Sequence, residues 1–331
     1  MPREYTEEDV RVRPQGRKSR PRSKDRPEHR DARPGLVLTV DRGRFRVVLA
    51  DDGTRITAVR ARELGRRGIV VGDRVGVSGD TSGTPGSLAR IVRVDKRSTA
   101  LRRTPDDDDA TERIVVANAE ILGVVVAAAD PAPRERFIDR CLVAALDAGL
   151  EPLLIVTKTD LDSADDLAAG YRALGMRLVR TSSKKPVTEL KDLLTNRTTV
   201  LIGQSGVGKS TLVNRLVPEA DREIGAVNEV TGRGRHTSTS AVGLSLPGGG
   251  WIIDTPGLRS FGLGHIDPGK ILEAFGELAD GAAGCPRGCD HLPPHCALDD
   301  WVASGGAGPA GEARLESLRR LLRSLSSQEI N

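Results

Sequence analysis

Two styles of hydrophobic patterning follow one another along this chain. Between residues 35 and 104, apolar and polar positions alternate in short runs that glycine and aspartate interrupt. Strands this short and closely spaced favour a small barrel of the OB type, and an SH3-like barrel would give a similar pattern. The strands predicted in this region are Gly35–Val40, Arg44–Ala50, Arg55–Arg60, Arg74–Ser78 and Ser87–Val94.

From residue 110 onward, continuous apolar runs alternate with amphipathic segments. Helices are expected over residues 134–150 and 163–174 and from Lys209 onward. Apolar strands between such helices indicate a parallel sheet that helices cover on both faces. The strands predicted here are Ile121–Ala129, Pro152–Thr157, Arg177–Arg180, Thr199–Ile202, Ala241–Leu246 and Trp251–Asp254.

The pattern predicts a multidomain α/β protein. It begins with a polar arm rich in arginine and proline, which we expect to be disordered. The OB-fold barrel follows, and Pro105 with the acidic run Asp106–Asp109 predicts a linker to the α/β domain. A helical domain comes last. Its final helix, Glu312–Ser326, should pack its leucine face on the other helices of this same helical domain. The expected bounds are 1–34, 35–104, 110–263 and 264–331.

Composition and the lack of long apolar runs indicate where in the cell the protein is located. The chain has 331 residues, of which 38% are hydrophobic, so it can bury two or three cores. No apolar run approaches the ~20 residues of a membrane-spanning helix, and the first residues lack the apolar stretch of a secretory signal. We therefore expect a cytoplasmic protein without a membrane partner.

Positive charge is concentrated near the start of the chain. The net charge is only +4, but residues 11–24 contain arginine and lysine and no acidic residue. Such an arm either remains a solvated tail or gains affinity for nucleic-acid phosphates by counterion release. In the barrel, Arg42, Arg44 and Arg46 are the candidates for phosphate contacts, and a spacer or protein-docking barrel is the alternative.

A phosphate-binding loop lies between an apolar strand and an expected helix. Glycines at such a loop let several backbone N–H groups point at one phosphate, and the helix N-terminus adds partial positive charge. Lys209 would reach the β- and γ-phosphates, and the Ser210 hydroxyl would bind Mg²⁺. The predicted nucleotide-binding residues of this segment are Gly203, Gln204, Ser205, Gly206, Val207, Gly208, Lys209, Ser210 and Thr211.

Two further segments complete the expected phosphate end of the site. Asp254 and Gly257 belong to a DTPG motif after an apolar strand, where Asp254 would hold the Mg²⁺ shell through water and Gly257 would sense the γ-phosphate. Thr237, with Thr239 as the alternative, is the expected Mg²⁺ ligand of the glycine-rich segment between the two motifs.

The equipment for hydrolysis is incomplete. Leu258 and Arg259 follow the DTPG motif, where many GTPases carry a glutamine that orients water. His236 is the candidate to orient water, beside Lys209 and Thr237, and Arg233 or Arg235 could instead orient water or stabilise charge. An arginine finger contributes roughly 10³–10⁵ in rate, so its absence predicts slow intrinsic turnover that a partner accelerates.

A base-reading motif precedes the phosphate loop. Asp160 would accept hydrogen bonds from guanine N1–H and the 2-amino group, and Lys158 would pack its stem along the ring. Thr157 stands where asparagine is commoner, which predicts the loss of an amide that braces the phosphate loop and weaker nucleotide binding. The predicted base-binding residues are Thr157, Lys158, Thr159 and Asp160, with Ser182 and Ser183 offering an N–H to guanine O6. Ordinary GTPases have the phosphate loop first, so this order indicates a circular permutation.

Three of the four cysteines lie close together. Cys285, Cys289, His291 and Cys296 provide the ligand set of a closed structural zinc site, with His295 as the alternative to His291. In a reducing compartment, such a cluster favours metal binding over disulfides. Cys141 lies in an apolar helical stretch and is expected in a core.

The barrel, the permuted GTPase motifs and the cysteine cluster, in this order, resemble the RsgA (YjeQ/YloQ) family of small ribosomal subunit biogenesis GTPases. The resemblance covers residues 35–300 and rests on TKTD at 157–160, GQSGVGKSTL at 203–212, GRGRHTST at 232–239, DTPGLRSFGL at 254–263 and the cysteine cluster. Thr157 and a cluster spacing one residue shorter than the commoner form depart from the family pattern.

The resemblance implies a GTPase that acts late in small-subunit maturation. It implies binding to ribosomal RNA, stimulation by the small ribosomal subunit, GTP and GDP as substrate and product, Mg²⁺, one structural Zn²⁺ and a monomeric chain. One alternative is an RNA-binding assembly factor whose nucleotide is mainly structural. A general translation or stress GTPase is another, because it would share every motif.

Overall fold

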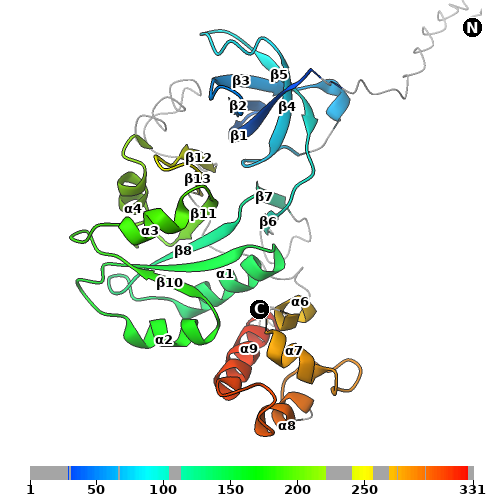
Figure 1. Ribbon diagram of the computed structural model, residues 1–331, viewed down its shortest axis with the longest axis vertical. Helices are drawn as coiled ribbons and strands as arrows, with labels where there is room; N and C mark the ends of the chain where they lie inside the picture. Colours follow the sequence, from blue (N-terminus) through cyan, green and yellow to red (C-terminus); the bar gives the residue numbers. More distant parts are fainter. Residues whose placement is uncertain are drawn as a thin grey trace, which may run out of the picture.

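The computed structural model describes residues 29, 31–65, 68–103, 113–220, 241–255, 268–273, 275–294 and 296–326. A barrel, an α/β domain and a group of helices follow one another along the long axis of the molecule (Figure 1). The predicted basic arm lies almost wholly outside the described residues. Among the described residues, no helix has the length and apolar character to cross a bilayer.

The N-terminal part is a closed five-stranded barrel. Its strands pair in the order β1-β2-β3-β5-β4, and β1 also pairs with β4 to close the ring. β3 and β5 run parallel while the other neighbours are antiparallel, so the chain crosses the barrel in the OB-like manner that the sequence predicts. The strands are β1 Arg33–Asp41, β2 Arg44–Leu49, β3 Arg55–Arg60, β4 Arg74–Gly79 and β5 Ala89–Val94, with the short helix η2 Arg62–Leu64 between β3 and β4.

Strict alternation fixes the core of the barrel. Val47, Val75 and Ile91 are fully buried inside it, whereas Arg44 is exposed on the outer face. The register pairs Arg44 with Val59, and Val59 with Arg90 on the neighbouring strand. Arg44 and Arg90 therefore lie on the outer face of β2 and β5, the two strands that flank β3, where both are exposed to solvent.

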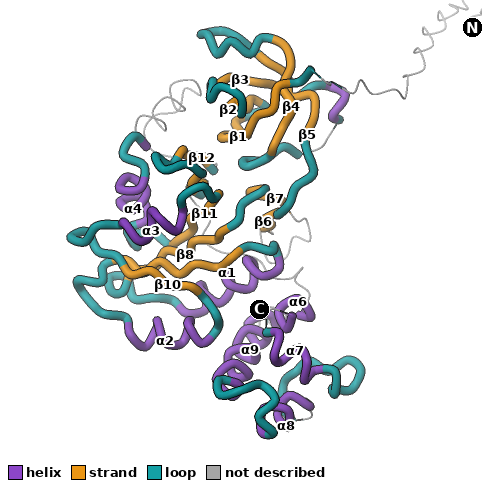
Figure 2. Tube along the Cα trace, in the orientation of Figure 1, coloured by secondary structure: helices purple, strands orange, loops and turns teal. Residues whose placement is uncertain are grey.

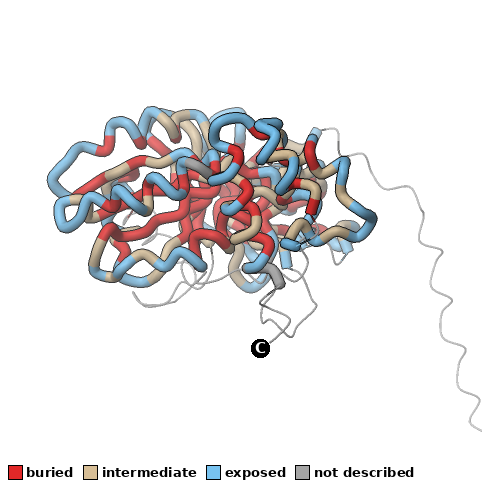
Figure 3. Tube along the Cα trace, turned by 90° about the horizontal axis from the view of Figure 1, so that it is seen from below, coloured by how far each residue is buried: buried red, intermediate tan, exposed pale blue. Residues whose placement is uncertain are grey.

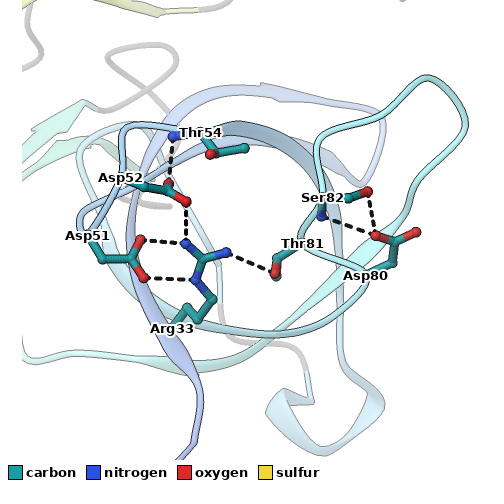
Figure 4. A network of polar contacts seen from close by, with 7 residues as sticks. All are labelled: Arg33, Asp51, Asp52, Thr54, Asp80, Thr81 and Ser82. Atoms are coloured by element: carbon teal, nitrogen blue, oxygen red, sulfur yellow. Dashed lines mark hydrogen bonds and ion pairs between the residues drawn. The ribbon is translucent and has the colours of Figure 1, made fainter.

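Arg33 fastens one end of the barrel (Figure 4). Its guanidinium donates to both carboxylate oxygens of Asp51, to Asp52 at 2.7 Å and to the Thr81 hydroxyl at 3.1 Å. The Thr54 N–H, with help from Arg33, lowers the pKa of Asp52 to about 2. The start of β1 is thereby held against the β2–β3 turn and the segment after β4.

The second domain is an α/β sheet with helices on both faces. Its strands lie in the order β10-β9-β8-β11-β13-β12, and the first five are parallel. The elements are β8 Ile121–Ala127, α1 Glu135–Asp147, β9 Glu151–Thr157, α2 Asp165–Ala173, β10 Arg177–Arg180, α3 Thr188–Leu194, β11 Thr198–Gly203, α4 Lys209–Leu216, β12 Val242–Ser245 and β13 Trp251–Asp254. β12 runs antiparallel to β13, so the sheet is mixed at this edge, where the pattern predicted a parallel sheet.

Alternate positions of the strands supply two separate cores. Leu122 and Val124 of β8 face a cluster that includes α1, while Ile121 and Val125 face a cluster that includes α3 and α4. Seen along the long axis, buried positions gather inside the molecule and exposed positions form its surface (Figure 3). Cys141 is fully buried on α1, as the sequence predicts.

The barrel is joined to the α/β domain at two places. Thr39 of β1 pairs with Val242 of β12, so the barrel continues the sheet of the α/β domain. The second junction lies at Gly72, whose carbonyl accepts a hydrogen bond of 2.9 Å from the Asn118 side chain. A two-stranded sheet, β6 Ala100–Arg103 and β7 Arg113–Ala117, flanks the expected linker, which lies outside the described residues.

The C-terminal part is helical (Figure 2). Its helices are α6 Pro268–Glu273, α7 Gly276–Ala282, α8 Ala297–Ala303 and α9 Gly311–Ser326. The bounds of α9 agree closely with the sequence prediction. Its packing differs from the expectation of a contact within the helical domain, because α9 packs on α1 and α2 of the α/β domain as well as on α7 and α8. Arg320 of α9 donates to the buried Asp139 of α1 at 3.0 Å and stacks over Tyr171 of α2.

Candidate nucleotide and metal sites

The predicted phosphate loop connects β11 directly to α4. Gly206 and Gly208 have φ angles of 82° and 86°, a left-handed conformation that glycine adopts without strain. A Cβ on Gly203 would lie 2.7 Å from the carbonyl oxygen of Val125, so only glycine fits where β11 ends. The glycines of the motif are therefore required by the backbone path itself.

Two cavities adjoin this loop. One of about 500 Å³ is lined by the phosphate loop, and one of about 340 Å³ is lined by the base-reading residues. They share Lys158, Gly208 and Thr211. The first is lined by Lys158, Gly203, Gln204, Ser205, Gly206, Gly208, Lys209, Ser210 and Thr211, and the second by Thr157, Lys158, Asp160, Leu161, Thr181, Ser182, Ser183, Gly208, Thr211, Leu212 and Arg215. Motifs far apart in the sequence thus meet at one continuous site.

An ion pair marks the phosphate end. Lys209, in the first turn of α4, contacts a carboxylate oxygen of Asp254 at the end of β13, and both side chains are largely buried. The parallel pairing of Leu201 with Asp254 brings these two motifs together. Thr255 donates to the Leu201 carbonyl at 2.9 Å, which holds the end of β13 against β11. Carboxylate and hydroxyl oxygens are ligands that Mg²⁺ prefers, so Asp254 and Ser210 fit this ion.

Thr157 braces the phosphate loop. Its hydroxyl lies 2.5 Å from the Val207 carbonyl oxygen and 3.1 Å from that of Val126. The sequence predicted that threonine, which lacks the asparagine amide usual at this position, would leave the loop without a brace. The structure corrects this expectation, because the shorter threonine reaches the loop with its hydroxyl.

The remaining base-reading residues are tied to one another. Thr159 donates from its backbone N–H and its hydroxyl to the Thr181 carbonyl, at 3.3 and 3.2 Å. Thr159 therefore links the TKTD segment to the segment after β10, although Thr159 does not itself line the cavity. Lys158 donates to the carbonyl oxygen of Asp130. Lys184 lies 3.8 Å from the Asp160 carboxylate, a distance at which an exposed pair contributes little.

Two buried hydroxyls point to a ligand. The Thr181 and Ser182 side chains are each 3% exposed, and neither hydroxyl has a hydrogen-bond partner within the described part of the protein. A buried polar group without a partner costs about 1–3 kcal/mol. Both residues line the base-reading cavity, so a ligand with hydrogen-bonding groups would satisfy them.

Several predicted site residues lie outside the described residues. These include the candidates for Mg²⁺ binding, water orientation and γ-phosphate sensing, together with the alternative zinc ligand. They are His236, Thr237, Thr239, Gly257, Leu258, Arg259 and His295.

The four predicted zinc ligands converge. The ligand atoms of Cys285, Cys289, His291 and Cys296 all lie within 4.8 Å of one another. Cys285 Sγ is 3.6 Å from His291 Nδ1 and 3.8 Å from Cys296 Sγ. Tetrahedral zinc, bound at about 2.3 Å to sulfur and 2.0–2.1 Å to nitrogen, spaces its ligand atoms by roughly 3.5–3.8 Å. The donor set and its spacing therefore fit a closed zinc site.

A bound cation would change the protonation of this cluster. Burial, with the neighbouring thiols of Cys285 and Cys289, raises the pKa of Cys296 to about 11. A divalent cation favours the thiolate and offsets this shift. Arg319 of α9 donates to the His291 carbonyl at 3.1 Å and to both oxygens of Asp299 at 2.7 Å, which ties the cluster to α8 and α9.

Sequence reasoning missed Arg215 and Thr181 as residues of the site. Arg215 lies on α4 beyond the motif, and its guanidinium reaches the carbonyls of Ser182 and Lys185. No local sequence signal marks such a residue, because the contact depends on how α4 packs beside the turn after β10. Thr181 directly precedes the predicted Ser182, so extending that motif by one residue would have included it.

Comparisons with known proteins agree with this geometry. The profile of the RsgA GTPase family matches residues 94–264. A protein of Marinobacter nauticus named small ribosomal subunit biogenesis GTPase RsgA is 38% identical over 273 residues, covering 79% of this chain and 75% of that protein. RsgA 1 of Vibrio vulnificus is 36% identical over 314 residues, with 91% and 86% covered.

Solved structures show the same architecture. The crystal structure of YjeQ from Thermotoga maritima has a TM-score of 0.65 and 28% identity, covering 89% of this chain and 98% of that chain. The crystal structure of YloQ, described as a circularly permuted GTPase, also has a TM-score of 0.65, at 22% identity, with 92% and 98% covered. The latter supports the fold alone.

Proposed function

This chain belongs to the RsgA GTPase family, and from this membership we infer that it hydrolyses GTP in the maturation of the small ribosomal subunit. One structural observation supports this inference at the level of individual residues. The base-reading and phosphate-loop motifs, in permuted order along the chain, line two adjoining cavities that share Lys158, Gly208 and Thr211. A guanine nucleotide would extend across both.

Each end of the site has a distinct role in this proposal. Asp160 reads the N1–H and 2-amino group of guanine, and Lys158 packs along the base. Lys209 neutralises charge on the β- and γ-phosphates, which requires it to exchange Asp254 for phosphate oxygens. Ser210 and, through water, Asp254 would hold Mg²⁺, which supplies charge stabilisation at the transferred phosphoryl group.

The step of hydrolysis depends on residues beyond the described part of the chain. We propose that Thr237 joins Ser210 at Mg²⁺, that Gly257 senses the γ-phosphate and that His236 orients water. No glutamine follows the DTPG motif at the usual position, so intrinsic turnover is expected to be slow. Contact with the small ribosomal subunit would complete the site and accelerate the reaction.

The flanking domains supply the surfaces for this partner. Arg44 and Arg90 on the outer face of the barrel, and the basic arm before it, suit contacts to ribosomal RNA phosphates. The cysteine cluster leaves no open coordination position, so its zinc would hold the C-terminal domain together. As parts of the same proposal, the chain acts as a monomer in the cytoplasm.

The deciding experiment is GTP hydrolysis by the purified chain, alone and with isolated small or large ribosomal subunits. Stimulation by small subunits and not by large ones is the expected result, and Lys209→Ala should abolish it. Slow hydrolysis that no ribosomal particle accelerates would instead favour an assembly factor with a mainly structural nucleotide. Stimulation by another particle would favour a general translation GTPase.

A further inference from the structure

The phosphate-loop helix reaches the far wall of the base-reading cavity through one side chain. Arg215 is half-buried on α4 and donates from Nη1 to the Ser182 carbonyl at 2.7 Å and from Nη2 to the Lys185 carbonyl. Lys185 N–H also approaches the Ser182 carbonyl, at 3.4 Å, so residues 182–185 form a turn. The guanidinium bridges the two ends of this turn.

This contact closes a ring of three links among the nucleotide-binding segments. Thr157 links the TKTD segment to the phosphate loop through Val207. Thr159 links the TKTD segment to the Thr181 carbonyl, directly before the turn. Arg215 supplies the third link, from the phosphate-loop helix to the turn. Each segment is thus held by the other two, and a displacement of one moves the walls of both cavities.

The position of this turn matters for the recognition of one atom of the base, guanine O6. Asp160 is a carboxylate and reads the donors of guanine, so the O6 acceptor needs donors from another wall of the cavity. Residues 181–183 form that wall, and the buried hydroxyls of Thr181 and Ser182 have no protein partner among the described residues. When the buried donors of a site find an acceptor only in the bound ligand, the site discriminates strongly against ligands that lack this acceptor.

We propose that Arg215 is a positioning residue for guanine selectivity, because it holds the turn 182–185 where its donors meet guanine O6. The inference rests on the proposed function and assigns to this chain a selectivity device outside the GTPase motifs. Arginine suits the task, since its planar fork spans two carbonyl oxygens at once. A lysine would offer a point charge to one of them.

The experiment measures nucleotide selectivity by competition against a fluorescent GDP analogue with the full-length chain. Three competitors separate the contacts: GDP, 6-thio-GDP, which replaces O6 by a weaker acceptor, and IDP, which lacks only the 2-amino group. Arg215→Met keeps the apolar stem and removes the donors, whereas Arg215→Lys keeps the charge. Arg136→Met, at an exposed position of α1, is the matched control.

For Arg215→Met we expect GDP affinity to fall about tenfold, the loss of one to two charge-assisted hydrogen bonds. The preference for GDP over 6-thio-GDP should shrink toward one, while the preference over IDP stays as in the wild type, because Asp160 is unchanged. Arg215→Lys should fall between the two, and Arg136→Met should match the wild type.

Two results with Arg215→Met would overturn the inference and leave the proposed function intact. Wild-type selectivity in Arg215→Met would show that the turn holds its place without the arginine. An equal loss of affinity for all three nucleotides would assign Arg215 a general structural role. A wild-type chain that binds no GDP would overturn the proposed function and this inference together, whereas wild-type binding beside an unchanged Arg215→Met variant overturns the inference alone.

Discussion

At the scale of single residues, Thr157 shows how a departure from the usual GTPase motif is accommodated. A hydroxyl has one proton to donate, and the Val207 carbonyl at 2.5 Å is closer than that of Val126 at 3.1 Å. The proton therefore goes to the phosphate loop, and Gly208 follows Val207 directly. A methyl group in its place would leave a buried carbonyl without this partner.

We predict that Thr157→Val weakens GDP binding while Thr157→Ser preserves it. Valine has nearly the same shape but no donor, so the phosphate loop of the free protein can leave the position that GDP requires. Restoring that position on binding costs up to about 1–2 kcal/mol for the unsatisfied carbonyl, or roughly fivefold to thirtyfold in affinity. Titration calorimetry with GDP would measure the effect, and thermal unfolding without nucleotide would check that both variants fold. Equal affinity of Thr157→Val and the wild type would contradict the brace.

Asp139 is a second residue whose environment has a measurable consequence. It is buried on α1, accepts from the Tyr171 hydroxyl at 2.8 Å and pairs with Arg320. Burial raises its pKa above the ordinary value of 3.8, and attraction to Arg320 opposes that shift only in part. Glu135, also close, raises the pKa further.

The sign of the pH dependence follows from this shift. Between the unfolded pKa and the raised folded pKa, the native state binds more protons than the unfolded state, so the contribution of Asp139 to stability falls as pH rises. It is constant above the folded pKa. We predict that Asp139→Asn removes this fall from the urea-unfolding free energy measured from pH 4 upward. Parallel profiles for the variant and the wild type would contradict the prediction.

At the scale of elements, the strands follow from the sequence because side-chain alternation or continuous burial marks them. The predicted bounds of β3, β10 and β13 match the structure, and those of β1 and β2 differ by a residue or two. The seven-residue helix α3 and the paired strands β6 and β7 were missed. They are too short to show a clear period, and the partner of β6 lies beyond an acidic run that suggested a linker.

The same limit applies to the site. Within the described residues, the predicted nucleotide-binding residues either belong to a motif with a fixed spacing or, for Ser182 and Ser183, directly follow a predicted strand, and the sequence displays both signals. Arg215 and the pairing of β12 with β1 depend on elements that meet only in the folded chain. Periodicity and spacing carry no information about such contacts.

The C-terminal helices form an element group that should depend on metal. Arg319 connects the His291 carbonyl to α9, and Asp299 of α8 receives the same guanidinium. We predict that Cys289→Ser, or chelation of the wild type, removes about one zinc per chain and unfolds this group at a lower temperature. Mass spectrometry of bound metal and limited proteolysis would measure both.

Cys141→Ser is the matched control for that experiment. Cys141 is a buried thiol on α1 and is separate from the cluster, so this variant should retain its zinc even if it is somewhat less stable. Metal content that is unaffected in Cys289→Ser would contradict the assignment of the cluster.

At the scale of the whole molecule, the central α/β domain is tied on both sides. Arg320 of α9 pairs with Asp139 and stacks over Tyr171, which joins the C-terminal helices to α1 and α2. α2 follows the TKTD segment, so the C-terminal helices are connected to the base-reading side of the nucleotide site. On the other side, the barrel continues the central sheet through β1 and β12.

The junction with the barrel at Gly72 can be tested with a matched pair of glycines. Gly72 and Gly43 have φ angles of 86° and 82°, so alanine brings a similar backbone strain of about 1–2 kcal/mol at either position. A Cβ on Gly72 would lie 2.0 Å from the Ala117 carbonyl oxygen, whereas a Cβ on Gly43 would meet nothing within 4 Å. The difference between the two variants therefore isolates the contact between barrel and α/β domain.

We predict that Gly72→Ala lowers the free energy of unfolding by about 1–3 kcal/mol more than Gly43→Ala does, the usual cost of overpacking. Its effect should also be local. The Ala117 N–H donates to the Val71 carbonyl at 3.0 Å, so displacement of this junction should speed hydrogen exchange at Ala117 while exchange in β9 stays slow. Equal destabilisation by the two substitutions, with unchanged exchange at Ala117, would mean that the close approach of Gly72 to Ala117 does not hold the barrel in place.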